Sequence, residues 1–85
     1  MENRTIWIKK LIYRSKYTGT KETDLLLGNF AENYLTKLND DQLLNYEELL
    51  VSGDPRIWRL SIDVEKTDNE KEKNIILLIK EFKGF

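Results

Sequence analysis

The fold is constrained most strongly by residues that end one helix and begin the next, because they divide the chain into short segments. Such residues stand at 18–22, 39–42 and 52–55. Gly19 and Gly53 suit the position just past a helix end, where the backbone needs a positive φ that glycine adopts without a Cβ penalty. Pro55 suits the first helical position, where its missing N–H would have no partner. We therefore expect several short helices joined by tight turns.

The polar residues after each break are suited to N-caps. Thr20 is expected to cap the second helix by accepting a hydrogen bond from an N–H in the first turn. Asn39 or Asp40 is expected to cap the third helix and Asp54 the fourth. Acidic residues follow in the first turns, where the helix dipole favours negative charge.

Apolar residues recur with helical spacing between the breaks. The predicted helices cover residues 5–17, 21–38, 40–51, 55–62 and 74–82. The expected core positions are Trp7, Ile8, Leu11, Ile12 and Ser15; Leu26, Leu27, Phe30, Ala31, Tyr34, Leu35 and Leu38; Leu43, Tyr46, Leu49 and Leu50; Ile57 with Trp58 or Leu60; and Ile75, Leu78, Ile79 and Phe82. This pattern predicts an all-α fold, a small five-helix bundle formed by a single domain over residues 1–85.

The carboxyl-terminal part of this pattern has two interpretations. Residues 75–79 are apolar all round and fit a buried strand as well as a helix, and the neighbouring helices favour a helix. Residues 63–73 are polar and charged, and they are expected to form a loop capped by Asp68 or Asn69. Counted from that cap, the C-terminal helix spans about residues 69–83.

Two residues of the second helix do not fit its apolar stripe. Gly28 costs about 1 kcal/mol relative to alanine inside a helix, and close approach of another helix would explain it. Leu25 projects to the polar side, so it either packs under the first helix or is an exposed apolar contact.

The composition argues against an enzyme. The chain has no cysteine and no histidine, so it lacks a disulfide framework, a thiolate, the usual metal ligand and the usual proton shuttle at neutral pH. It has no glycine-rich phosphate loop either. No apolar run approaches the roughly 20 residues that span a bilayer, and the amino terminus lacks the apolar core of a signal peptide. We expect a soluble, intracellular, non-catalytic monomer without a metal site or membrane insertion.

Charge is distributed unevenly along the chain. Residues 1–21 carry six basic residues and one acidic residue, whereas residues 22–65 carry ten acidic residues and three basic ones. This asymmetry is consistent with a cationic surface for a partner, and equally with attraction between the two parts inside the fold. A nucleic-acid-binding domain would use Lys9, Lys10 and Arg14, but the acidic pI of about 5.5 argues against it.

The stretch around Gly19 resembles a known family. The matching residues are Leu-Ile-Tyr-Arg-Ser at 11–15, Gly-Thr-Lys-Glu-Thr-Asp-Leu-Leu-Leu-Gly at 19–28, and Phe30, Ala31 and Leu35. Over about residues 6–60 the chain resembles the succinate dehydrogenase assembly factor 2 family, also called SdhE or the flavinylation factor. Its motif is arginine-glycine followed after two residues by glutamate. Gly19 and Glu22 keep this motif, and Thr18 replaces the arginine.

The resemblance implies an assembly factor, or chaperone, that binds the flavoprotein subunit of succinate dehydrogenase. It would promote covalent attachment of FAD to a histidine of that subunit, without holding FAD stably itself. Glu22 is expected to face the partner after the turn at Gly19. The implied partner-binding residues are Tyr13, Arg14, Lys16, Thr18, Gly19, Lys21, Glu22, Asp24 and Leu25.

The implied location is the cytoplasm, or the mitochondrial matrix in a eukaryote. A general helical interaction module that binds through Tyr13 and Leu25 remains the main alternative, and nucleic-acid binding is a further one.

Overall fold

The computed structural model describes residues 3–83. In chain order the elements are α1 (Arg4–Lys16), α2 (Lys21–Tyr34), the 3-10 turn η1 (Leu35–Lys37), α3 (Asp40–Val51), α4 (Asp54–Ser61) and α5 (Glu70–Lys83). The described part contains no strand, so the predicted all-α fold with five helices is confirmed and residues 75–79 are helical. The ends of the predicted domain, residues 1–2 and 84–85, lie outside this part. None of the helices described is long and apolar enough to cross a membrane.

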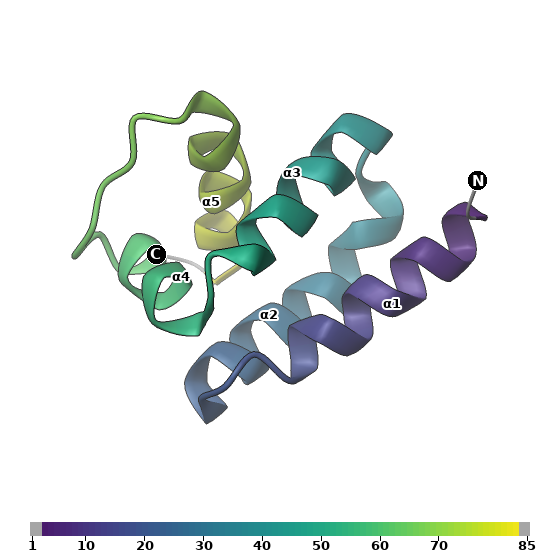
Figure 1. Cartoon of the computed structure of the whole chain (residues 1–85), viewed down its shortest axis with the longest axis horizontal. Coiled ribbons are helices and arrows are strands. Elements are labelled where there is room, and N and C mark those ends of the chain that lie inside the picture. The colour runs from purple at the N-terminus through teal and green to yellow at the C-terminus, as the bar shows by residue number, and fades with distance from the viewer. Residues whose placement is uncertain (1–2, 84–85) are drawn as a thin grey trace.

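The helices form two groups around a shared core. Helices α1 and α2 lie side by side and run in opposite directions, with the turn that joins them at one end of the molecule (Figure 1). Helix α3 runs alongside α1, and α4 and α5 pack on its other side (Figure 1). The turn between α1 and α2 therefore comes close to the start of α4, although the two are far apart in the chain.

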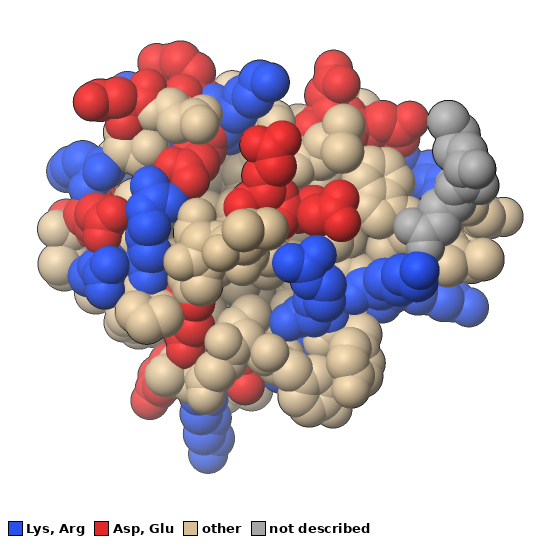
Figure 2. Space-filling model, in the orientation of Figure 1, with Lys and Arg blue, Asp and Glu red and all other residues tan. Residues whose placement is uncertain are grey.

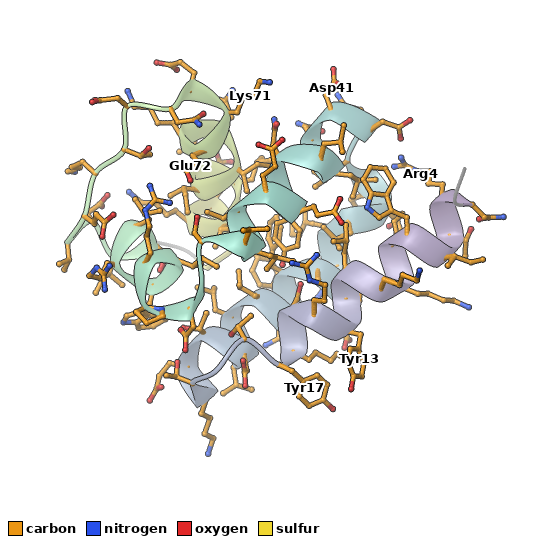
Figure 3. All side chains as sticks on the ribbon, viewed as in Figure 1. Arg4, Tyr13, Tyr17, Asp41, Lys71 and Glu72 are labelled. Carbon is orange, nitrogen blue, oxygen red and sulfur yellow. The ribbon has the colours of Figure 1, made fainter. Side chains whose placement is uncertain are left out.

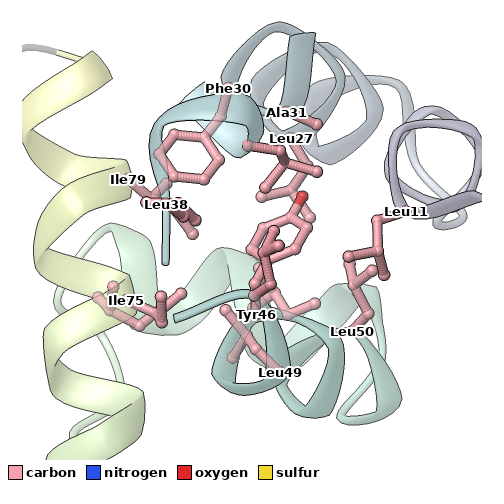
Figure 4. Close-up of a cluster of buried hydrophobic side chains, with 14 of the residues drawn as sticks. Leu11, Leu27, Phe30, Ala31, Leu38, Tyr46, Leu49, Leu50, Ile75 and Ile79 are labelled. Atoms are coloured by element: carbon pink, nitrogen blue, oxygen red, sulfur yellow. The ribbon is translucent and has the colours of Figure 1, made fainter. Parts of the chain in front are cut away.

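The core is built from the apolar stripes of all five helices (Figure 4). Phe30 of α2 lies at its centre, with its ring centroid 5.6 Å from that of Tyr46 and 5.9 Å from that of Phe82. Most predicted core positions are buried, which confirms the helical spacing. The predicted positions that are only partly buried are Trp7, Ile12, Tyr34, Trp58, Leu78 and Phe82.

A buried hydroxyl pair ties α1 to α3 inside this core. The hydroxyl of Ser15 donates to the Leu11 carbonyl at 2.7 Å and lies 2.5 Å from the Tyr46 hydroxyl. Burial raises the pKa of Tyr46, so the phenol stays protonated at any physiological pH. Both hydroxyls are therefore hydrogen-bonded where they are buried, as a packed core requires.

Close contact between α1 and α2 explains the glycine inside α2. A Cβ built on Gly28 would lie 3.1 Å from Cγ of Lys16. The predicted explanation, close approach of another helix, is confirmed, and that helix is α1. On the far side of α2, Leu25 is 57% exposed, so it is an exposed apolar residue and does not pack under α1.

The helix ends agree only partly with the sequence prediction. Asn39 caps α3, and its side chain and that of Gln42 form a reciprocal capping box. Asn69 caps α5 by accepting from the Lys71 and Glu72 N–H groups, so the predicted loop ends at residue 69 and not at residue 73. The second α-helix ends at residue 34, because η1 tightens the chain before the turn into α3.

The prediction for α4 was wrong in its cap. Gly53, with φ +88°, occupies the N-cap, and Asp54 is the first helical residue. Asp54 is drawn into the protein interior by its contacts with the turn between α1 and α2, where it is only 5% exposed. Burial of this side chain has consequences for the candidate site.

The connection between α4 and α5 is held by Arg56. Its guanidinium donates to both carboxylate oxygens of Glu72, at 2.7 and 2.8 Å, and to Glu65 at 3.0 Å. Glu72 also accepts from the Thr67 hydroxyl at 2.7 Å. The hydrogen bonds from Arg56 lower the pKa of Glu72 to about 2. A long charged loop is thereby fixed against the helices that it joins.

Charged residues gather by sign on the surface. Basic side chains cover the outer side of α1, and acidic side chains lie over the adjoining part of α3 (Figure 2). Ion pairs join Arg4 to Asp40, Arg14 to Glu47 at 3.6 Å, and Lys16 to Glu32. Several basic residues of the first part of the chain therefore pair with acidic residues of the second part within the fold.

Candidate functional site

The turn between α1 and α2 is held by the carboxylate of Asp24. Its Oδ1 accepts from the Thr18 N–H and hydroxyl, both at 2.6 Å, and from the Gly19 N–H at 3.2 Å. The Thr18 hydroxyl and then its N–H lower the pKa of Asp24. Asp24 thus has a structural task in the turn, and its predicted role toward a partner is not tested by this geometry.

Gly19 lies at the centre of this turn and is required there for two reasons. Its φ of +145° belongs to a region that side-chain-bearing residues rarely adopt. A Cβ at this position would also lie 2.9 Å from Oδ2 of Asp54. The backbone of the turn therefore touches the first residue of α4, which the sequence pattern did not indicate.

The prediction for Thr20 was wrong in its hydrogen bond. Thr20 occupies the N-cap of α2, but its hydroxyl caps no N–H of the first turn. The hydroxyl lies 3.2 Å from Asp54 Oδ1 and 3.2 Å from the Thr23 hydroxyl. The side chain is thus turned toward α4, where its hydroxyl donates to the carboxylate, and it accepts from no N–H of the first turn.

Five of the nine predicted partner-binding residues line two surface hollows, and Lys16, Gly19, Lys21 and Asp24 line neither. The first, of about 230 Å³, lies between the end of α1 and the start of α4. Its lining residues are Tyr13, Arg14, Tyr17, Thr18, Leu50, Gly53 and Asp54. Tyr13 and Tyr17 project from α1, with ring centroids 4.8 Å apart (Figure 3).

The second hollow, of about 440 Å³, lies where α2 meets α4 and α5. Its lining residues are Glu22, Leu25, Leu26, Asn29, Trp58 and Phe82. Glu22 and Leu25 are one helical turn apart, so their side chains share this face of α2. Tyr13 and Arg14 therefore lie in a different hollow from Glu22, and Lys16 lines neither of the two.

The predicted charged residues differ in whether their charge is already paired. Arg14 lies 3.6 Å from Glu47, and Lys16 forms an ion pair with Glu32. Lys21 and Glu22 are exposed and form no ion pair or side-chain hydrogen bond within residues 3–83. Of these predicted charged residues, Lys21 and Glu22 are thus the ones whose charges remain available to a partner.

Several residues of these hollows were missed as site candidates. Tyr17 ends the predicted first helix and is not among the expected partner-binding residues, and the sequence predicts Asp54 to be an N-cap. Trp58 and Phe82 were read as core, yet both line the second hollow at its edge. The signal for Tyr17 was its spacing of four residues from Tyr13, whereas nothing in the local sequence places Asp54 beside Gly19.

The side chains at the two hollows are suited to binding and offer little for catalysis. They supply tyrosine and tryptophan rings, exposed leucine and carboxylates. Within the described residues no group of three or more acidic, histidine or cysteine side chains is arranged to hold a metal ion. Aromatic and apolar surface beside a few charges is typical of a protein–protein contact.

The comparison with protein families decides the identity of this fold. The family model described as the flavinator of succinate dehydrogenase matches residues 9–83. The chain belongs to this family. The resemblance seen around Gly19 is thus confirmed, and the match reaches beyond residues 6–60 to include α5.

Curated relatives carry a consistent name. Succinate dehydrogenase assembly factor 2-A, mitochondrial, from Drosophila willistoni is 39% identical over 75 residues, which cover 86% of this chain and 48% of the relative. Succinate dehydrogenase assembly factor 2, mitochondrial, from Dictyostelium discoideum is 39% identical over 71 residues, which cover 84% of this chain and 50% of the relative. The chain spans about half the length of these relatives. No solved structure matches it significantly.

Proposed function

We propose that this protein is an assembly factor that binds the flavoprotein subunit of succinate dehydrogenase and promotes covalent attachment of FAD to a histidine of that subunit. The observation that carries the proposal is the match to the flavinator family over residues 9–83. The names of the relatives, assembly factors of succinate dehydrogenase, point to the same enzyme.

The surface around Glu22 supports a role in partner binding. Glu22 carries a charge with no ion pair among the described residues, and Leu25 beside it is 57% exposed. Together they line the hollow that Trp58 and Phe82 complete. A partner segment with a basic side chain next to an apolar one would pair with Glu22 and cover Leu25.

The proposed role is to hold the partner and leave the chemistry to it. The whole chain has no histidine and no cysteine, so it offers neither the usual proton shuttle nor a thiolate. Rigid aromatic and charged contacts can instead stabilise one conformation of the flavoprotein subunit in which the attachment proceeds. In this scheme FAD is bound by the partner, and the assembly factor acts as a monomer that departs afterwards.

The location follows from that of the partner. The relatives are named as mitochondrial proteins. We place the protein in the mitochondrial matrix if its source is eukaryotic and in the cytoplasm otherwise.

Substitution of Glu22 tests the proposal. The flavoprotein subunit is co-expressed with wild-type protein, with Glu22→Gln or with Glu48→Gln, an exposed acidic residue of α3 that serves as the matched control. Covalent flavin is then measured by fluorescence of the denatured subunit in a gel. We expect the signal with wild-type protein and with Glu48→Gln, and a large loss with Glu22→Gln. An equal signal from a folded Glu22→Gln variant would contradict the assignment of Glu22.

A further inference from the structure

Asp54 is an unusual residue in this fold because its charge is buried. It is 5% exposed, and it is the one charged residue among those described that is buried. A buried carboxylate is costly unless other groups supply hydrogen bonds or an opposite charge.

The protein itself compensates this carboxylate only in part. Oδ1 lies 3.2 Å from the hydroxyl of Thr20, and no ion pair involves Asp54 in the described part of the chain. Oδ2 lies beside Gly19 and accepts no hydrogen bond from the described residues. Among the described residues, every side-chain oxygen that is fully buried has a hydrogen-bond partner. Because Oδ2 has none, it keeps some access to solvent.

The first hollow is the opening that Asp54 lines. Its walls are the rings of Tyr13 and Tyr17, whose exposed fractions are 66% and 68%. Arg14 also lines it, but its guanidinium is 3.6 Å from Glu47 and is balanced by that carboxylate. The charge of Asp54 is the one in this hollow that no ion pair balances.

We propose that this hollow is a binding site for an arginine side chain of the partner protein, with the guanidinium paired to Asp54 and stacked on Tyr17 or Tyr13. Arginine fits better than lysine for two reasons. Its planar fork of N–H donors matches a carboxylate, and its flat, weakly hydrated cation stacks on aromatic rings. The inference rests on the proposed function only in that it assigns the arginine to the flavoprotein subunit.

Thr18 lines the same hollow, and Gly19 lies beside the carboxylate of Asp54. A side chain at position 19 would push on Oδ2 of Asp54, so glycine keeps the carboxylate where an incoming guanidinium can reach it. Thr18 is short and is turned toward Asp24 by its hydroxyl, which leaves the hollow open above it. The turn therefore shapes the site as well as joining two helices.

The first test uses the isolated protein and a small probe. N-acetyl-arginine N-methylamide is titrated into ¹⁵N-labelled protein, with the citrulline analogue, which has the same shape but no charge, as the ligand control. We expect saturable shifts of the amide signals at Thr18, Gly19 and Asp54 with the arginine probe alone. Asp54→Asn should weaken this binding at least about tenfold, whereas Asp41→Asn, an exposed acid in the first turn of α3, should leave it unchanged.

A second variant, which leaves the buried residues unchanged, still tests the site if Asp54→Asn does not fold. Tyr17→Leu changes an exposed ring and should weaken probe binding about threefold or more. The proposal would be overturned if the citrulline probe bound as tightly as the arginine probe, or if neither probe shifted the amide signals. It would also be overturned if both folded variants bound the arginine probe as tightly as the wild-type protein.

The second test uses the flavoprotein subunit. Asp54→Asn should lower its affinity for the protein at least about tenfold, and Asp41→Asn should not. If wild-type protein fails to bind this subunit, the proposed function fails, and the probe titration still decides whether the arginine site exists. If the subunit binds Asp54→Asn as tightly as wild type, the assignment of its arginine to this hollow is wrong.

Discussion

The contact between Gly19 and Asp54 makes a quantitative prediction about stability. Gly19 and Gly53 both have positive φ values, +145° and +88°, so alanine at either position is strained by about 1–3 kcal/mol. A Cβ added at Gly53 would meet no atom within 4 Å. A Cβ added at Gly19 would lie 2.9 Å from Oδ2 of the buried Asp54. Alanine at position 19 must also displace that carboxylate and weaken its hydrogen bond with Thr20. We expect Gly19→Ala to cost about 1–2 kcal/mol more than Gly53→Ala.

Urea unfolding followed by circular dichroism measures this difference. A small domain has a denaturant slope of about 1–3 kcal/mol/M, so the midpoint of Gly19→Ala should lie about 0.3–2 M below that of Gly53→Ala. Asp54→Ala removes the obstructing oxygens, and in that background the extra cost of Gly19→Ala should disappear. Equal midpoints for the two single variants, or an extra cost that persists without the Asp54 carboxylate, would refute the packing argument.

Three further predictions concern the framework that holds the site. Tyr46→Phe removes the hydroxyl 2.5 Å from that of Ser15 and should lower the free energy of unfolding by about 1 kcal/mol in urea titration; no loss would mean that this hydrogen bond is not needed. Because Arg56 lowers the pKa of Glu72 to about 2, the stability this pair adds above about pH 4.5 should be lost as the pH falls toward 2, and Arg56→Gln should flatten that part of the stability profile. If the stability of Arg56→Gln changed with pH as that of the wild-type protein does, the Arg56–Glu72 pair would not be the cause of the acid-induced loss of stability. Asn39→Ala breaks the capping box of α3 and should cost about 1 kcal/mol by thermal unfolding, and a wild-type melting curve would contradict the cap.

The helices were predictable from sequence because their determinants are local. Apolar residues such as Leu27, Phe30 and Ala31 recur with the period of a helix, and all three are fully buried. The break at 39–42 gave the right start for α3, since its cap and capping-box partner lie three residues apart in the chain. The cap of α5 was among the expected candidates for the same reason.

The site was predictable only in part because its contacts join distant parts of the chain. Thr20 and Asp54 are separated by 34 positions, and only the packing of α4 against the α1–α2 turn brings them together. Glu22 follows the cations of α1 by only a few positions in the sequence, but its helix turns it toward Trp58 and Phe82. Nearness in the sequence therefore does not show which of these residues share a hollow.

Reconstitution with purified components tests the central claim most directly. The flavoprotein subunit, prepared without covalent flavin, is incubated with FAD in the presence or absence of this protein, and covalent attachment is followed over time by mass spectrometry of the intact subunit. We expect the mass of the subunit to increase by one covalently bound flavin much faster when the protein is present. The same rate of attachment with and without the protein would contradict the proposed function.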